Sequence, residues 1–422
     1  MTISEPFDTA THHELGLMQG FPPPAGKRVD RLNGIWEPPY NRWAYQHMRR
    51  IWSTARVRPG DAGPALGREI DAGIGTLSVR RKDGSLADFE CFLRQTFTDS
   101  LIVVHKDRVV YERYLNGMTP DTPHIMFSCT KSFIGLFALM SIEEGRVTRD
   151  TPIVDIIPEL NNGSGFSDAT FGQVLDMTAS LKFSEYYADP EAAIHDYVAV
   201  LGAGIKADNW DGPRSLYDYA ATLPKLEGRA HGAVFEYQTP QADVLNWAVS
   251  RLFDQDFVAL LESRLWSRLG MTGEAYVLLD AAGNLFAGGG LNATAEDMAR
   301  FASAMLRNGR VGGEQIIPEA VIDTLSRGGS TEAFLRGPSA EEDMANGHWS
   351  YCAQWWIRNT PGSEAIIAMG VNGQWIYVDR NRQVAVIKQS SQPEADSWYF
   401  HDYTCNAMDV LVRHVAGEPM TT

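Results

Sequence analysis

The chain has 422 residues, 44% of them hydrophobic and 21% charged, which is enough apolar material for one large domain or two closely packed ones. Its formal net charge is −16, and no stretch gathers lysine and arginine into a basic stripe, so we expect neither a nucleic-acid partner nor binding to an anionic membrane surface. No apolar run of about 18 residues occurs, so we expect no membrane-spanning helix.

Three features bear on the cellular compartment and on metal binding. Residues 1–28 are acidic, interrupted by prolines and without the apolar core of a secretory signal. The four cysteines are widely spaced and form neither a C-x-x-C pair nor a zinc-type cluster (Cys91, Cys129, Cys352 and Cys405). The ten histidines include no H-E-x-x-H motif. These features predict a cytoplasmic protein without a metal site, although a disulfide stays open.

The first elements are a lead-in and a hairpin. Residues 1–60 predict an extended, proline-rich segment, in which the aromatic side chains of 34–48 pack onto the body and 1–33 form the lead-in proper. Within 92–115, the runs "SLIVVH" and "RVVYERYL" are rich in β-branched residues and flank the short turn "KD". This pattern predicts two antiparallel strands.

Helical patterns follow. The apolar run after the hairpin predicts a helix over about 128–144, ended by Gly145 as a left-handed cap. A further amphipathic helix is expected over 294–309, with Thr294 as N-cap and Asp297 three residues later, close to a capping box. Between these two helices, apolar residues recur with helical spacing in three segments (170–181, 240–253 and 256–270).

Strand character returns at 364–391, as two alternating runs joined by the turn "DRNR", and a last helix is expected over about 400–416. This order of elements predicts an α+β fold, an antiparallel sheet flanked by helices with an inserted all-α domain. We assign 1–150 and 291–422 to the sheet domain and 151–290 to the helical domain.

One candidate for chemistry is the pair Ser128 and Lys131, which lie three residues apart and share a helix face. An S-x-x-K match arises by chance about once in a chain of this length, so a surface serine beside a solvated lysine is the simpler interpretation. However, the helix dipole disfavours a lysine in the first turn, and the face that follows is strongly apolar. Burial would lower the pKa of the lysine, leaving a neutral amine to take the serine proton.

A proton relay would need a third group, and Tyr237 stands at the end of an extended run just before a helix. Taken alone, Tyr237 is more often a packed core residue than a catalyst. The motifs in combination are far more specific. The chain resembles the serine β-lactamase/DD-peptidase superfamily and, within it, the 6-aminohexanoate-dimer hydrolases and β-lactamase-like carboxylesterases. Beyond about residue 34, the resemblance rests on "SCTKS", "VLDMTASLKFSEYYADP", "FEYQTPQADVLNW", "GVNGQWIYVD" and "IKQSSQPEADSW".

The resemblance implies a β-lactamase/transpeptidase-like fold with the active site between the two domains. It implies that Ser128 is the nucleophile, Lys131 its general base and Tyr237 the proton relay, with the N–H groups of Ser128 and Val371 forming the oxyanion hole. The superfamily's third motif, K-T-G, falls on residues 368–370, "AMG", which have no lysine. A usual clamp for a β-lactam carboxylate is therefore missing.

The substrate pocket is expected to include five residues. By resemblance, Tyr187 contacts the amide nitrogen of the substrate, and Asp196 matches, loosely, a position that faces a substrate amine. Gly288 falls where efficient nylon-dimer hydrolases carry an asparagine, which puts strong activity on that dimer in doubt. Trp355 and Trp356 of "QWW" are expected to form pocket wall or core, because apolar pockets favour aromatic residues.

The expected function is a serine hydrolase that cleaves linear amide or ester bonds of small molecules through an acyl-enzyme, without metal or organic cofactor. Three alternatives stay open: a carboxylesterase with little amidase activity, a DD-peptidase or β-lactamase, and a non-catalytic acyl-binding protein. The DD-peptidase or β-lactamase fits less well, because cell-wall substrates lie outside the cytoplasm. The acyl-binding protein also fits less well, because it needs no set of Ser, Lys and Tyr. The resemblance is compatible with a homodimer.

Overall fold

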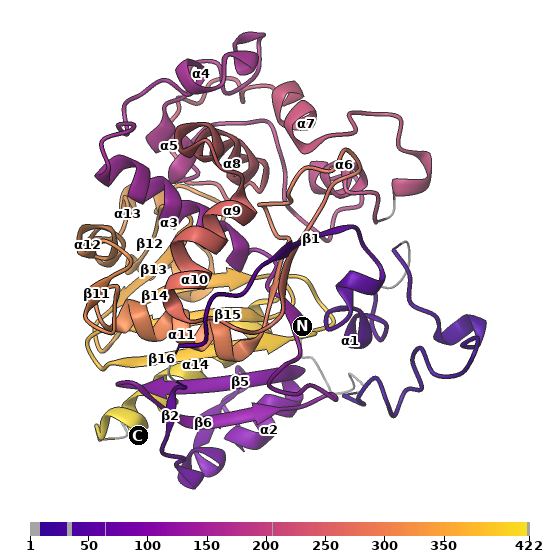
Figure 1. Cartoon of the computed structure of the whole chain (residues 1–422), viewed down its shortest axis with the longest axis vertical. Coiled ribbons are helices and arrows are strands. Elements are labelled where there is room, and N and C mark those ends of the chain that lie inside the picture. Colours follow the sequence, from indigo (N-terminus) through magenta and orange to yellow (C-terminus); the bar gives the residue numbers. More distant parts are fainter. Residues whose placement is uncertain (1–8, 32–35, 64, 205, 420–422) are drawn as a thin grey trace.

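The computed structural model describes residues 9–31, 36–63, 65–204 and 206–419. Its central element is an eight-stranded sheet in the order β12-β13-β14-β15-β16-β5-β6-β2, in which every neighbouring pair is antiparallel except β2 and β6 (Figure 1). The strands are β12 (Trp349–Cys352), β13 (Trp355–Thr360), β14 (Ser363–Gly370), β15 (Gln374–Asp379), β16 (Val384–Ser390), β5 (Thr98–His105), β6 (Arg108–Tyr114) and β2 (Gly67–Arg68).

The central strands are buried on both faces, which explains their nearly continuous apolar sequences. Alternate residues of β5 enter different cores, because successive side chains of a strand point to opposite faces. Ile102 and Val104 join the core that includes helices α3 (Cys129–Glu143) and α11 (Ala295–Leu306). Leu101 and Val103 join the core on the other face, which includes helices α2 (Phe89–Gln95) and α14 (Trp398–Ala416).

A helical region lies above the sheet in Figure 1, with α8 packed against α3, α5 and α7. The helices of this region are α4 (Ile153–Ile156), α5 (Phe171–Leu175), α6 (Ala193–Val200), α7 (Leu216–Thr222), α8 (Pro240–Phe253), α9 (Phe257–Leu261), a π-helical turn (Glu262–Trp266) and α10 (Ser267–Leu269). The model therefore has mixed helices and sheets, with the helices gathered in the middle of the chain as the sequence predicts.

A second, four-stranded sheet has the order β1-β8-β9-β7. Its strands are β1 (Thr54–Val57), β8 (Ala275–Leu278), β9 (Leu291–Ala293) and β7 (His124–Ile125). Strand β8 lies inside the range predicted to be helical and pairs with β1 from the lead-in. Strand β7 leads within three residues to Ser128 at the start of α3, so this sheet fixes the entry of the chain into that helix.

The remaining elements complete the fold. They are the helices α1 (Asn41–Ala44), α12 (Glu319–Arg327) and α13 (Thr331–Leu335), the strand pairs β3 (Ser78–Arg80) with β4 (Leu86–Asp88) and β10 (Arg310–Val311) with β11 (Glu314–Gln315), and the 3₁₀ turns η1 (Ala25–Lys27), η2 (Met48–Arg50), η3 (Ala72–Thr76), η4 (Pro158–Asn161), η5 (Ala207–Asn209) and η7 (Glu342–Asn346). No helix in the described ranges is long and apolar enough to cross a membrane.

Several local predictions are confirmed. Strands β5 and β6 form the expected hairpin. Helix α3 ends before Gly145, whose φ is +70°. The Thr294 side chain accepts a hydrogen bond from the Asp297 N–H, as its place before α11 predicts.

One prediction is wrong. The two runs expected in 364–391 are three strands, because Asn372 and Gly373 have φ of 58° and 88° and turn the chain between β14 and β15. Asn-Gly is a strong hairpin signal, and it was overlooked inside an apolar run.

Candidate active site

Ser128 stands at the N-terminal end of α3, after a tight turn. Phe127, directly before it, has φ of 42°, which is uncommon for a bulky residue. The turn is held by hydrogen bonds from the Cys129 N–H to the Met126 carbonyl and from the Thr130 N–H to the Phe127 carbonyl. A serine at such a turn is held in one orientation, with its backbone N–H ahead of the first turn of the helix.

Lys131 is fully buried beneath that serine. Its Nζ lies 2.8 Å from Ser128 Oγ and donates a 2.6 Å hydrogen bond to the Gly288 carbonyl. Burial lowers the pKa of Lys131 to about 8, although the carboxyl groups of Glu185 and Asp243 act to raise it. A substantial fraction of neutral amine is therefore present near neutral pH, as a base for the serine proton requires.

The structure brings Tyr237 to the same hydroxyl. The Ser128 hydroxyl acts to lower the pKa of Tyr237, so the two groups are neighbours, and the Tyr237 ring lies 5.0 Å from Lys131 Nζ. The ring stacks on Trp356 at 5.5 Å, which fixes its orientation. Burial raises the pKa of Tyr237 well above its ordinary value, so the phenol stays protonated and can act as a hydrogen-bond donor. Three groups able to exchange protons thus meet within one site.

Two backbone N–H groups lie on segments that approach each other, at Ser128 and at Val371 next to Gly370. Among the residues that the structure describes, neither the Ser128 N–H nor the Val371 N–H has a hydrogen-bond partner. Gly370 brings the two segments together, since a Cβ added there would lie 3.1 Å from the Ser128 nitrogen and only 2.6 Å from the Met126 carbonyl oxygen. Two such donors could stabilise the negative charge of a tetrahedral intermediate.

Glu185 is a member of the site that the sequence did not indicate. Its carboxyl group accepts hydrogen bonds of 2.6 Å from both the N–H and the hydroxyl of Thr239, and one of 3.2 Å from the Tyr187 hydroxyl. Burial raises its pKa, against the opposing effect of Lys131. The available signal was its position two residues before Tyr187. The Tyr187 hydroxyl is therefore present in the site but already bonded to a carboxyl group.

Gly288 lies in the site, but it acts through its backbone, whereas the sequence analysis expected a position that contacts the substrate. Its carbonyl holds Lys131, and its N–H donates a 3.1 Å hydrogen bond to Asp243, which also accepts from Tyr197. A Cβ at Gly288 would lie 2.6 Å from the Tyr197 hydroxyl and from Thr239 Cγ2. Glycine is required here, and burial raises the pKa of Asp243 to about 7.

One predicted pocket residue lies in the core, and another already has a charged partner. Trp355 is fully buried, and its indole N–H donates a 3.0 Å hydrogen bond to the Ser132 carbonyl, so its assignment to the pocket wall is corrected to the core. Trp356, the next residue on β13, points to the other face and lies against Tyr237. Asp196 on α6 forms an ion pair of 3.0 Å with Lys206, so its carboxylate already has a cation.

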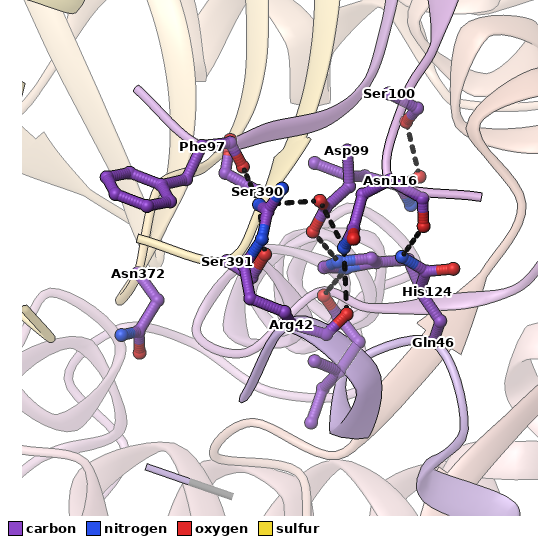
Figure 2. A network of polar contacts seen from close by, with 12 residues as sticks. Arg42, Gln46, Phe97, Asp99, Ser100, Asn116, His124, Asn372, Ser390 and Ser391 are labelled. Atoms are coloured by element: carbon purple, nitrogen blue, oxygen red, sulfur yellow. Dashed lines mark hydrogen bonds and ion pairs between the residues drawn. The ribbon is translucent and has the colours of Figure 1, made fainter. Parts of the chain in front are cut away.

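Figure 2 shows a buried polar network around Asp99. Asp99 forms an ion pair of 3.1 Å with Arg42, lies 3.1 Å from His124 Nε2 and accepts a 2.9 Å hydrogen bond from Asn116. The same Arg42 nitrogen donates a 2.9 Å hydrogen bond to Ser391 Oγ. Arg42 and His124 lower the pKa of Asp99 even though burial acts to raise it, so the carboxylate stays charged. His124 lies four residues before Ser128, which ties the network to the nucleophile segment.

The other end of the network reaches the Val371 turn. The side chain of Gln374 donates to the carbonyls of Val371 at 3.3 Å and Ser390 at 2.7 Å. Asn372 donates a 2.8 Å hydrogen bond to the Gln392 carbonyl. One set of buried contacts therefore holds both segments that carry the unpaired N–H groups.

The chain has recognisable relatives. A family model described as Beta-lactamase matches residues 88–401. The 6-aminohexanoate-dimer hydrolase of Paenarthrobacter ureafaciens is 30% identical over 381 residues, which is 90% of this chain and 92% of that protein. A candidate 6-aminohexanoate-dimer hydrolase from Bacillus anthracis matches with a TM-score of 0.83 and 28% identity over 94% of this chain and 100% of that one. A penicillin-binding protein homologue from Pyrococcus abyssi shares the fold, with a TM-score of 0.58 and 18% identity over 78% of this chain and 76% of that one.

Proposed function

Because the chain belongs to the beta-lactamase family and is a serine hydrolase, we propose that Ser128 is its nucleophile and that it cleaves linear amide or ester bonds of small molecules through an acyl-enzyme. The observation that carries this proposal is the position of Lys131 Nζ, 2.8 Å from Ser128 Oγ and 5.0 Å from the Tyr237 ring. A neutral amine on the hydroxyl and a protonated phenol beside it supply both the base and the acid that acyl transfer requires.

In the first step, neutral Lys131 takes the Ser128 proton as Oγ bonds to the substrate carbonyl carbon. The carbonyl oxygen becomes an oxyanion and accepts hydrogen bonds from the N–H groups of Ser128 and Val371, each contributing about 3 kcal/mol in comparable sites. The bond to the leaving nitrogen or oxygen then breaks. Tyr237 gives its proton to the leaving group and regains one from Lys131, so the proton count balances.

In the second step, water replaces the leaving group and attacks the acyl carbon. Tyr237 and Lys131 carry protons in the reverse direction, and Ser128 regains its own as the acid product departs. No metal or organic cofactor takes part in the proposed reaction, since the proton transfers and the charge stabilisation are all assigned to groups of the chain.

For the substrate, we propose a linear amide of the 6-aminohexanoate type, named for the Paenarthrobacter relative. Tyr187 supports it, because the family resemblance implies that this phenol contacts the amide nitrogen, and it lies in the same site as Tyr237. A carboxylesterase is the second candidate, favoured by two observations. The Tyr187 hydroxyl already donates to Glu185, and Gly288 has no room for a side chain that could hold an amide. The absence of lysine in "AMG" at 368–370 argues against β-lactams.

We further propose that the enzyme acts in the cytoplasm on small molecules and has no nucleic-acid partner. The net charge of −16 supports the second point, since phosphate backbones would be repelled. A homodimer is proposed on the family resemblance alone. We propose a helical domain within 151–290. Its C-terminal boundary would move to a residue before β8, because that strand pairs with β1.

The test is a pair of rates on purified protein, with p-nitrophenyl acetate and the linear 6-aminohexanoate dimer as substrates. Ser128→Ala should abolish turnover of both. Ser141→Ala is the matched control, because Ser141 is a buried serine of the same helix whose hydroxyl bonds to the Ala138 carbonyl. Turnover of the ester alone would favour the carboxylesterase, and substantial activity in Ser128→Ala would refute the mechanism.

A further inference from the structure

A second group of reactive side chains lies in and beside the first turns of α14. His401 and Cys405 are one helical turn apart on that helix, and Asp343 comes from the turn η7. His401 Nε2 lies 3.3 Å from Asp343 Oδ1 and 3.5 Å from Cys405 Sγ, and the three donor atoms lie within 4.8 Å of one another. None of the three residues belongs to the Ser128 site.

The geometry does not suit a Cys–His–Asp proton relay. In such a relay, the thiol and the carboxylate bind opposite nitrogens of the imidazole, whereas here both approach Nε2. A single N–H cannot satisfy both acceptors. Accordingly, Asp343 Oδ1 is a buried atom without a hydrogen-bond partner among the described residues. The three donor atoms are therefore close together, and one of them lacks a hydrogen bond.

We propose that Asp343, His401 and Cys405 form a Zn²⁺ site. Zinc bonds to carboxylate, imidazole and thiolate at about 2.0–2.3 Å, and two such bonds at a tetrahedral angle place their donors about 3.3–3.6 Å apart. The two separations from His401 Nε2, 3.3 and 3.5 Å, fall in this range, and the third pair, Asp343 Oδ1 and Cys405 Sγ, lies within 4.8 Å, so these two ligands would close up on the bound ion. Thiolate and carboxylate together neutralise the ion, and a thiolate ligand disfavours Mg²⁺ and Ca²⁺.

The surroundings allow entry and fix the central ligand. The Asp343 side chain is 30% exposed, which leaves a path for the ion and a place for water as fourth ligand. The ring of His401 lies among three indole rings, 5.9 Å from Trp349, 5.6 Å from Trp375 and 5.2 Å from Trp398. Bound zinc would join η7 to α14, so its effect is on stability and not on the proposed hydrolysis.

The sequence did not predict this site, because Asp343 is 58 residues from His401 and follows no ligand motif. The visible signal was the His-x-x-x-Cys spacing within a predicted helix, which places both side chains on one face. The spacing is weak evidence by itself, and only the fold adds the third donor.

Cobalt and zinc titrations of chelator-treated protein test the proposal. Co²⁺ should bind once per chain and give the near-ultraviolet charge-transfer band of a cobalt–thiolate bond. Zn²⁺ should displace it and raise the melting temperature. Cys405→Ser should remove the band and weaken Zn²⁺ binding about tenfold or more. Cys91→Ser is the matched control, because Cys91 is a partly exposed cysteine whose sulfur is near Arg81.

Absence of a thiolate–cobalt band in the wild type would overturn the site and leave an ion pair of His401 with Asp343. Equal zinc affinity in wild type and Cys405→Ser would do the same. If Cys405→Ser does not fold, Asp343→Asn gives the comparison, since that side chain is partly exposed and lies on a short turn. Zinc affinity should fall in that variant, and an unchanged affinity would refute the carboxylate ligand.

Discussion

In the part of the chain that the structure describes, two buried lysines lie beside serines, and one of them belongs to the proposed active site. Burial lowers the pKa of Lys131 to about 8 and that of Lys388 to about 7. Lys131 contacts Ser128, and Lys388 contacts Ser390 and the Thr96 carbonyl. Their electrostatic surroundings are also alike, since a carboxylate acts to raise the pKa of each. A lowered lysine pKa next to a hydroxyl is therefore insufficient to identify a nucleophile.

The difference lies around the serine. Ser128 is 8% exposed, whereas Ser390 is 0% exposed inside strand β16. The Ser390 N–H donates to Gln374 Oε1, while the Ser128 N–H has no partner in the described part of the chain. A nucleophile needs access for substrate and free donors for the oxyanion, and both follow from its place at a helix start after a tight turn.

The largest effect should separate the two lysines directly. Lys131→Met should lower kcat/KM for p-nitrophenyl acetate by about 10⁴-fold or more, because no other described base contacts Ser128. Lys388→Met should leave kcat/KM within about threefold of the wild type. Its unfolding free energy should change by less than about 2 kcal/mol, since replacing a buried charge with a similar apolar group is often neutral. Parallel esterase assays and urea denaturation measure both. Comparable losses of activity would erase the distinction.

A smaller effect should come from replacing Tyr187, a residue of the site around Lys131. Tyr187→Phe should lower the rate of amide cleavage about tenfold and leave ester cleavage nearly unchanged, because only an amide nitrogen needs a hydrogen-bond partner as it departs. Rates on the linear dimer and on p-nitrophenyl acetate measure the ratio. Tyr186→Phe is a matched control, since Tyr186 is an exposed neighbouring tyrosine. Equal losses on both substrates would remove the amide-specific role.

The smallest effect concerns pH. As neutral Lys131 is the base, kcat/KM should rise with pH through about 8. Glu185→Gln should move this midpoint to lower pH, because Glu185 raises the pKa of Lys131. Stability should also rise with pH between about 7 and 10.5, where the unfolded chain binds protons that the two folded lysines have lost. Lys388→Met should reduce only the rise in stability. A midpoint unmoved in Glu185→Gln would contradict the coupling.

The sequence predicted what depends on near neighbours. The β5–β6 hairpin, helix α3 and the pair Ser128–Lys131 rest on spacings of a few residues, and Tyr237 entered through the family motifs. Glu185 was missed because its partner Thr239 lies 54 residues away.

Trp355 and Trp356 could not be told apart, because adjacent strand residues exchange faces and the sequence does not say which face is the pocket. The proposed zinc ligands and the Asp99 network were also missed, because they join segments that are far apart in the sequence and that only the fold brings together.

The Asp99 network also indicates which part of the chain the active site needs. Arg42, and Tyr45 whose carbonyl accepts from the Ile125 N–H, come from a segment upstream of the family match, which begins at residue 88. Through Arg42, that segment supplies the positive charge beside Asp99, and the Asp99 network holds the segments that carry the N–H groups of Ser128 and Val371. A fragment trimmed to residues 88–401 would keep Ser128, Lys131 and Tyr237 but lose the arginine that balances Asp99. The segment that carries Arg42 and Tyr45 is therefore part of the preorganised structure around the site.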